Sequence, residues 1–184
     1  AQRGRDFGVI LTCLAQVGYC VEWRVVNAAQ YGAAQRRRRT FLFAYRYDTA
    51  YSERMASVPA DAIIQSDGLM AQAFPIQDMG SVTEATIGND LAAVSDSFAF
   101  DFENAGCLRG RKIYTAKITE AEEAPITLGT ILQRGVDKTY DIPDDELVKW
   151  KYLKGAKRIP RVAANGHAYT FSEGAVAFPD PWDR

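Results

Sequence analysis

The sequence is poor in the residues that build metal centres, disulfide frameworks and membrane spans. It contains one histidine, His167, and three cysteines that form no CxxC pair, so no histidine- or cysteine-based metal site is expected. The odd and uneven set of Cys13, Cys20 and Cys107 indicates a reducing compartment, and we interpret all three as small buried residues. No apolar run approaches the roughly 20 residues that a membrane helix needs. We therefore expect a cytoplasmic protein with neither metal nor membrane association.

The beginning of the chain also lacks the apolar segment of a secretory signal peptide. The first residue is Ala1 and not methionine, so we expect the chain to be a piece of a longer protein. Its 184 residues are 47% hydrophobic and 24% charged, which is typical of a globular protein with one sizeable core, or with a core and a smaller second unit.

The net charge of −1 hides a strong alternation along the chain. Residues 1–46 contain eight arginines and two acids, whereas residues 47–104 contain ten acids and one arginine. Residues 147–172 contain six lysines or arginines and no acid. This alternation predicts a molecule with a cationic face that suits a phosphate backbone. Ordinary solvated charge is the alternative interpretation.

Four consecutive arginines stand at the centre of the most informative stretch. Residues 35–39 have the sequence Gln-Arg-Arg-Arg-Arg, here called the arginine segment, and the apolar residues 41–45 follow almost at once. Arginine stays charged and cannot be buried cheaply without a partner. Because the segment leads into an expected strand, its planar donors are held on a rigid element. That arrangement suits gripping a phosphate or a nucleobase in one geometry.

The residues around the arginine segment predict the edge of an α/β sheet. Asp6 can cap a helix that Gly18 ends, with an apolar face at Phe7, Ile10, Leu11, Leu14 and Val17. Residues 19–26 alternate as a strand with one covered face, formed by Val21, Trp23 and Val25, and with Glu22 and Arg24 on the other face. After a loop over residues 27–34, a second strand over about 39–45 is apolar enough to be covered on both faces.

The rest of the chain predicts a connector and a second unit. A short helix over 68–74 is possible in the connector. Strands over 97–102 and 111–118 could form a hairpin around a basic turn at 107–110. Further expected elements are a short helix over 127–133, a helix over 143–154, a basic loop over 154–161 and a strand over 167–171. We expect Trp23, Phe41, Trp150 and Leu153 to be core residues, with Leu147 completing an apolar stripe on the 143–154 helix.

The stretch around the arginine segment resembles the eighth motif of DNA cytosine-5 methyltransferases. That motif combines an Asn-Ala pair, present as Asn27 and Ala28, a Tyr-Gly turn at Tyr31 and Gly32, and Gln-x-Arg-x-Arg entering a strand, present in residues 35–39. Residues 150–158 and 165–180 resemble the end of the target-recognition region in one bacterial branch of the family, and residues 183–184 would lie just before the ninth motif.

The resemblance implies a mixed α/β fold in three parts. Residues 1–46 would be the trailing helix and two strands of a Rossmann-like methyltransferase sheet, at the edge of the catalytic domain. Residues 47–90 would be a connector, and residues 91–184 a small mixed α+β target-recognition domain. The whole enzyme would use S-adenosylmethionine to methylate C5 of a cytosine flipped out of duplex DNA. It would be a bacterial protein whose partners are double-stranded DNA and a cognate restriction endonuclease.

Three family features are absent from the sequence. No Pro-Cys pair supplies the attacking thiolate, no Glu-Asn-Val motif handles N3 of the base, and no glycine-bearing first motif holds S-adenosylmethionine. We therefore expect a C-terminal fragment that is inactive alone, binds no cofactor and needs the missing N-terminal catalytic part. The alternatives are a non-catalytic nucleic-acid-binding module and a relative of RNA cytosine methyltransferases.

The resemblance also implies roles for the arginine segment. Arg39 would reach toward O2 of the flipped cytosine, Arg37 toward the DNA backbone or the missing glutamate, and Gln35 would shape the loop. An enzyme that acts on a base must extrude it and hold its polar edge. Arg36 and Arg38 would contact phosphates or be solvated. The alternative for Arg37 and Arg39 is internal pairing with acids.

Other polar residues are candidates for DNA contact. Most would position phosphates, and one or two would contact base edges in the major groove. The first group is Lys154, Lys157, Arg158 and Arg161, and the second is Arg109, Arg111 and Lys112. A solvated loop is the alternative for both groups. Asn165 and His167 could contact bases, although a structural turn and a satisfied lone histidine are the simpler interpretations.

Overall fold

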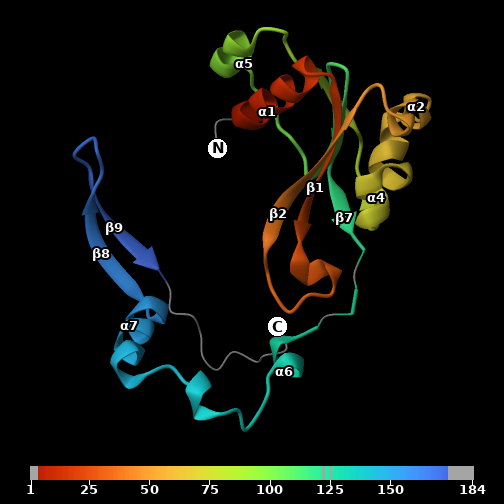
Figure 1. Cartoon of the computed structure of the whole chain (residues 1–184). Helices are drawn as coiled ribbons and strands as arrows, with labels where there is room; N and C mark the ends of the chain where they lie inside the picture. Colours follow the sequence, from red (N-terminus) through yellow and green to blue (C-terminus); the bar gives the residue numbers. More distant parts are fainter. Residues whose placement is uncertain (1–3, 122, 125, 174–184) are drawn as a thin grey trace. The chain divides into compact units, whose positions relative to one another are not determined.

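The chain folds into two compact units, the first ending at Ile126 and the second beginning at Thr127 (Figure 1). The computed structural model describes residues 4–121, 123–124 and 126–173. The predicted boundaries after residues 46 and 90 do not coincide with this division. The reason is strand pairing, because residues of the expected N-terminal part and of the expected second domain share one sheet. The assignment of catalytic and recognition domains therefore does not follow the compact units.

The N-terminal elements form where the sequence predicts them. Helix α1 (Arg5–Gln16) is followed by strand β1 (Tyr19–Asn27), a 3₁₀ turn η2 (Ala28–Tyr31) and strand β2 (Arg38–Arg46). Gly18 joins α1 to β1 with a φ of 81°, a left-handed conformation that favours glycine.

A five-stranded sheet organises the first unit. Its strand order is β2-β1-β5-β6-β4, and every neighbouring pair is antiparallel. The strands not yet given are β4 (Thr83–Thr86), β5 (Ala105–Arg109) and β6 (Lys112–Ala116). Strands β3 (Ile76–Met79) and β7 (Ile118–Glu120) form a separate two-stranded sheet. The predicted mixed α/β class is thereby confirmed.

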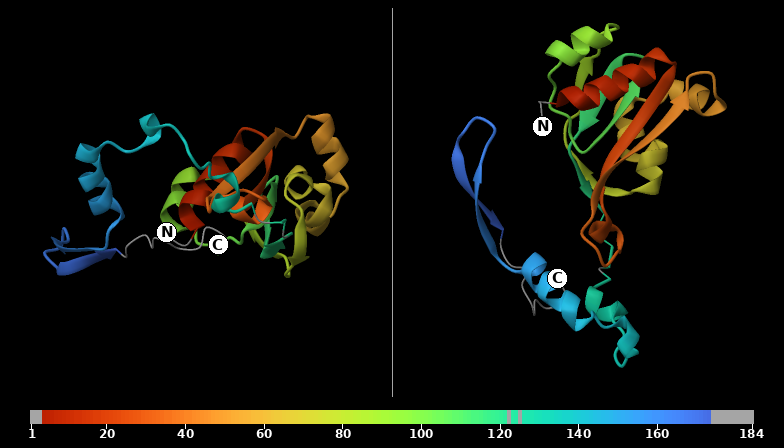
Figure 2. Two further views of the ribbon diagram at one scale, coloured as in Figure 1. Left: turned by 90° about the horizontal axis from the view of Figure 1, so that it is seen from below. Right: turned by 60° about the vertical axis from the view of Figure 1, so that its left-hand side comes forward.

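Helices cover the two faces of the sheet (Figures 1 and 2). One face carries α1 and α5 (Leu91–Ser97), and its core includes Leu11, Val21 and Ile113. The other carries α2 (Ala50–Ala56), α3 (Ala60–Ala62), the π-helical turn η3 (Ile63–Asp67) and α4 (Leu69–Ala73). Its core includes Ile64 and Cys107. The helix expected over 68–74 is confirmed as α4.

Several local predictions were wrong. Helix α1 buries Gly8, Leu11 and Thr12, so Ile10 and Val17 are 48% and 63% exposed. Cys13, expected to be buried, is exposed on the same helix.

The strand expected over 97–102 is also wrong. Its alternating aromatics, Phe98, Phe100 and Phe102, contact one another's rings and pack onto the α1 core without joining the sheet. The expected hairpin of 97–102 with 111–118 was therefore wrong, because β6 pairs instead with β5. The turn between β5 and β6 lies at Gly110 and Arg111, because Arg109 pairs with Lys112.

The second unit is a chain of small elements. They are α6 (Leu128–Ile131), a 3₁₀ turn η4 (Lys138–Tyr140), α7 (Asp144–Lys154) and the antiparallel hairpin of β8 (Lys157–Val162) and β9 (Ala168–Glu173). The expected basic loop over 154–161 is thus mostly strand β8. Trp150 and Leu153 are 41% and 45% exposed and do not form a core within the described residues. No helix among the described residues is long and apolar enough to span a membrane.

Candidate nucleic-acid interface

The arginine segment lies at the beginning of β2 and is open to solvent. Arg38 pairs with Asn27 and Arg39 with Val26 in the β1–β2 ladder, so these two arginines point to opposite faces of the sheet. All four arginine side chains are exposed. Among the residues that the structure describes, none of them forms an ion pair. Arg39 donates only to the carbonyl of Arg38, at 2.8 Å. The alternative of internal pairing with acids therefore finds no support here.

A compact turn presents the arginine segment. The Asn27 side chain accepts a hydrogen bond from Ala29 N–H (3.4 Å) and caps η2, and Gly32 ends η2 with a φ of 74°. The backbone N–H of Ala28 donates to the carbonyl of Arg37 (3.1 Å), which closes the turn. Asn27 and Gly32, two of the residues named from the motif, thus have local structural reasons for their identity.

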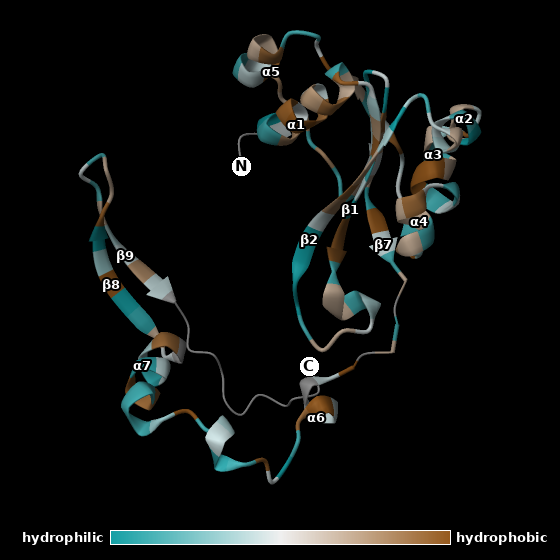
Figure 3. Ribbon diagram, in the orientation of Figure 1, coloured by the Kyte–Doolittle hydropathy of each residue, from teal (hydrophilic) through white to brown (hydrophobic). Residues whose placement is uncertain are grey.

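Among the described residues β2 is an edge strand of the sheet, and one of its faces is open: Leu42 and Ala44 are exposed, whereas Tyr45 on the other face is buried. Phe41 and Leu42 point to opposite faces and are 45% and 41% exposed. The prediction that this strand is covered on both faces was therefore wrong for the described residues. Figure 3 shows the apolar and polar positions of β2 on the first unit. An apolar strand with an unpaired edge is a natural site for another strand to add.

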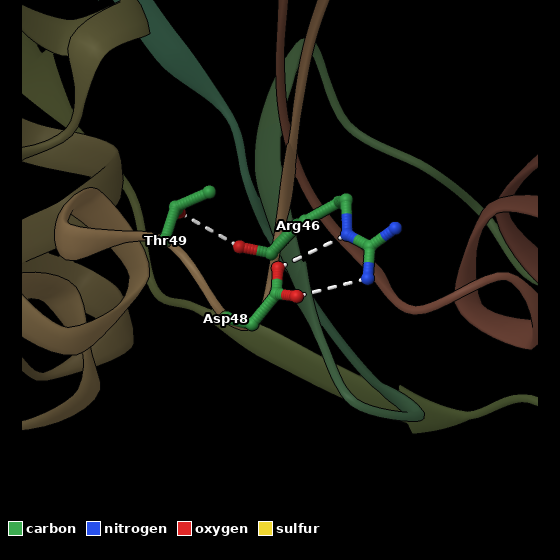
Figure 4. A network of polar contacts seen from close by, with 3 residues as sticks. All are labelled: Arg46, Asp48 and Thr49. Atoms are coloured by element: carbon green, nitrogen blue, oxygen red, sulfur yellow. Dashed lines mark hydrogen bonds and ion pairs between the residues drawn. The ribbon is translucent and has the colours of Figure 1, made fainter.

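The end of β2 differs from its beginning because its arginine is paired. Arg46 donates from Nε and a terminal nitrogen to the two carboxylate oxygens of Asp48, at 3.0 and 2.8 Å (Figure 4). Thr49 donates to the carbonyl of Arg46 and closes the turn into α2. The hydrogen bond from Arg46 lowers the pKa of Asp48 below its ordinary value. The open cationic surface is thus confined to the start of the strand.

The second basic group is mostly engaged inside the first unit. Arg109 donates to the carbonyls of Val58 (2.7 Å) and Ala56 (2.5 Å), and Arg111 donates to the carbonyl of Ile87. Lys112 is exposed on β6. Since the two guanidinium groups hold loops onto the sheet, the structure gives no support for their contact with DNA.

The β8–β9 hairpin carries the remaining candidates. Arg158 and Arg161 are exposed on β8, and the Arg161 guanidinium stacks 4.4 Å from the centre of the Phe171 ring. Lys157 donates to the carbonyl of Leu153 and lies over the Tyr152 ring, and Lys154 is the last residue of α7.

The turn of the hairpin holds the last two candidates. Asn165 accepts a hydrogen bond from His167 N–H at 3.1 Å, and both side chains are exposed. Of the stretches that carried the family resemblance, residues 174–180 and 183–184 lie outside the described residues.

Comparison with known proteins decides the family. The model of the C-5 cytosine-specific DNA methylase family matches residues 1–171. The chain belongs to this family. It is 45% identical over 183 residues to the type II methyltransferase M.Sau3AI of Staphylococcus aureus, an alignment that spans 98% of this chain and 44% of that relative. No solved structure gave a significant match.

The chain also buries two charges that the sequence pattern placed on an open face. Glu22 and Arg24 of β1 are each 1% exposed. Burial raises the pKa of Glu22, while hydrogen bonds from Met70 and Tyr51 limit the rise. Burial also lowers the pKa of Arg24, and the neighbouring Tyr31 opposes this decrease. A hydrophobic pattern cannot reveal such residues, because their partners lie 29 to 50 positions away.

The cysteines of this family member differ in environment. Cys107 is buried in the sheet, and burial raises the pKa of its thiol to about 12. Cys13 is exposed and Cys20 is half-buried. None of the three follows a proline. No group of three or more potential metal ligands occurs among the described residues.

Proposed function

We propose that this chain is the C-terminal part of a bacterial DNA cytosine-5 methyltransferase of a restriction–modification system. It would supply target recognition and part of the pocket for the flipped base. The observation that carries the proposal is the arginine segment: four exposed arginines without ion pairs among the described residues, at the start of a strand in a chain of this family. Exposed guanidinium groups bind phosphates and polar base edges well.

Arg39 and Arg37 are the proposed contacts to the extruded cytosine and its backbone, and Gln35 shapes the loop that precedes them. A flipped base loses its stacking and pairing, so a pocket must replace those interactions with hydrogen bonds to its polar edge. The side chains of Arg38 and Arg39 project from opposite faces of β2. Arg38 and Arg36 are therefore assigned to phosphates, which carry no sequence information.

The β8–β9 hairpin is the proposed recognition element of the second unit. A two-stranded ribbon fits the major groove of B-form DNA. Arg158 and Arg161 project from β8, and Asn165 and His167 lie at the turn where a ribbon would meet base edges. Lys157 at the base of the hairpin is assigned to phosphates, and so is Lys154 at the end of α7, whose side chain lies outside the described part of the structure. Lys112, exposed on β6, is a further candidate, whereas Arg109 and Arg111 are left out because both bind carbonyls.

The remainder of the methyltransferase is the proposed partner of β2. The chain covers 44% of the length of its relative M.Sau3AI, and among the described residues no strand pairs with the outer edge of β2, where Phe41 and Leu42 are exposed. Another strand added at this edge would extend the sheet toward a Rossmann-like arrangement and cover the apolar residues. In this proposal, residues 1–46 are the trailing edge of the catalytic domain.

S-adenosylmethionine is proposed as the methyl donor of the whole enzyme only. Between a strand and the helix that follows it, the described residues provide at most one glycine, Gly88 in the connection from β4 to α5. The residues present therefore do not fit a glycine-rich cofactor turn. The nucleophilic cysteine is likewise assigned to the remainder of the enzyme, so the chain alone should transfer no methyl group.

Binding to duplex DNA tests the proposal. We expect affinity to fall steeply between 50 and 200 mM salt, since each neutralised phosphate adds about −0.9 to the slope of log K against log salt. Arg38→Ala should reduce that slope by about 1. Arg39→Ala should instead reduce the preference for a duplex whose cytosine faces an abasic site and is easily extruded.

Fluorescence anisotropy with paired and abasic duplexes of one sequence measures both effects. Arg46→Ala is the matched control, because this arginine is on the same strand but paired with Asp48. An affinity that does not change across the salt series would contradict the proposal, as would equal effects of the Arg39 and Arg46 variants. Methylation of DNA by the chain alone would contradict its assignment as an inactive part.

A further inference from the structure

The buried pair Glu22 and Arg24 holds helix α4 at both of its ends. Because they are two positions apart on β1, both side chains point to the face that carries α4. The Glu22 carboxylate accepts a hydrogen bond from the N–H of Met70 at 3.0 Å. The Arg24 guanidinium donates to the carbonyl of Phe74 at 2.5 Å. These are the backbone groups that a short helix leaves free at its two ends. We call Glu22 and Arg24 the β1 clamp.

Further hydrogen bonds tie the β1 clamp to its surroundings. The Tyr51 hydroxyl donates to Glu22 at 2.7 Å and accepts from the N–H of Leu69 at 2.8 Å. Arg24 also donates to the carbonyl of Ile64 at 2.5 Å. The helix therefore has little freedom to shift along β1.

Phe74, at the end of α4, contacts both sides of the arginine segment. Its ring lies 5.3 Å from that of Tyr31, which precedes the segment, and 5.5 Å from that of Phe41, which follows it. The Tyr31 hydroxyl donates to the carbonyl of Pro75 at 3.3 Å. The position of Phe74 thus determines the positions of Tyr31 and Phe41, the residues on the two sides of the arginine segment.

Burying the charged residues of the β1 clamp has a high free-energy cost compared with an apolar core. Removing two charges from water costs several kcal/mol each unless hydrogen bonds replace the hydration. The Nε atom of Arg24 is buried with no hydrogen-bond partner among the described residues. Apolar residues of similar size would fill the same volume without that cost. Stability alone therefore gives no reason to retain these two charges, whereas control of the position of α4 does.

We propose that Glu22 and Arg24 are positioning residues for Arg37 and Arg39. By holding α4, they place Phe74 between Tyr31 and Phe41 and so fix the course of the arginine segment. The functional consequence, contact of the two arginines with the extruded cytosine, rests on the proposed function. Its structural part does not depend on DNA.

Hydrogen exchange of the chain without DNA tests the structural part. Arg24→Met should accelerate exchange of the amides of Ala28 and Ala33, whose hydrogen bonds close the turn before the arginine segment, by at least about tenfold. Arg109→Met is the matched control, because Arg109 also donates to two carbonyls but holds the end of α2. Phe74→Leu removes the ring contacts and leaves both charges in place, so it should reproduce the effect even if Arg24→Met fails to fold.

A double-mutant cycle on DNA affinity tests the consequence. Arg24→Met should weaken binding to the abasic duplex by roughly tenfold in the wild-type background and by much less in an Arg39→Ala background. Equal losses in both backgrounds, or unchanged exchange at Ala28 and Ala33, would overturn the inference. A wild-type chain without DNA affinity would overturn the proposed function, while the exchange result would still decide whether the clamp positions the segment.

Discussion

At the scale of single residues, burial separates the three cysteines by reactivity. Thiolates react and thiols do not, so the raised pKa of the buried Cys107, about 12, makes it inert at neutral pH. Cys13 is exposed on α1. We predict that iodoacetamide at pH 8 modifies Cys13 first and Cys107 only after unfolding. Mass spectrometry of timed samples measures this order, and early modification of Cys107 would contradict the described burial.

Glu22 predicts a particular dependence of stability on pH. Burial raises its folded-state pKa above the ordinary value of 4.5, so the folded chain binds this proton more tightly than the unfolded chain. Its contribution to stability is present in full below pH 4.5 and is lost as the pH rises through the folded-state pKa. We predict that Glu22→Gln gains stability relative to wild type as the pH rises above 4.5.

Urea unfolding at several pH values measures this difference in the free energy of unfolding. Glu53→Gln, the same charge change on an exposed position of α2, controls for net charge. Parallel curves for wild type and Glu22→Gln would show that Glu22 does not carry the effect.

At the scale of elements, the strand pair β1–β5 depends on one glycine. A methyl group at Gly106 would collide with the Trp23 indole and with the carbonyl of Tyr114, whereas one at Gly110 would meet no atom within 4 Å. We predict that Gly106→Ala lowers the free energy of unfolding by about 3 kcal/mol through overpacking. Gly110→Ala should cost only about 1 kcal/mol, from its left-handed backbone. Chemical denaturation compares the two, and equal losses would refute the packing argument.

Sequence patterns predicted the elements whose signal is local. Strands β1 and β2 and helix α7 all form close to the residues where they were expected, although β1 is buried on both faces and not on one. The prediction of a strand at 97–102 was wrong because an alternation of apolar residues indicates which side chains are buried. It does not indicate which backbone groups pair with another strand. Phe98, Phe100 and Phe102 are such a pattern without a neighbouring strand.

At the scale of the whole molecule, the sequence could locate the arginine segment but not what surrounds it. The exposed edge of β2 depends on which strands join the sheet, and the burial of Glu22 and Arg24 depends on residues from Tyr51 to Phe74. Long-range partners of this kind leave no periodic trace in the sequence. The motif therefore located the arginine segment, whereas the β1 clamp is visible only in the tertiary structure.

The free edge of β2 predicts complementation. If the remainder of a methyltransferase adds to this edge, a polypeptide with the Pro-Cys and glycine-bearing motifs of the family should restore DNA methylation when mixed with this chain. Leu42→Lys places a charge on the exposed apolar surface of the edge strand, and such charges oppose strand addition. We predict that this variant reduces the restored methylation at least about tenfold, while the chain itself keeps its fold.

Leu91→Lys is the matched control, because Leu91 is similarly exposed, at 37% against 41% for Leu42, but lies on α5. Transfer of a radioactive methyl group to duplex DNA measures the restored activity, and circular dichroism verifies the fold of each variant. If both variants restore methylation equally, β2 is not the junction. If only Leu42→Lys fails, the same strand that carries the arginine segment also joins the two parts of the enzyme.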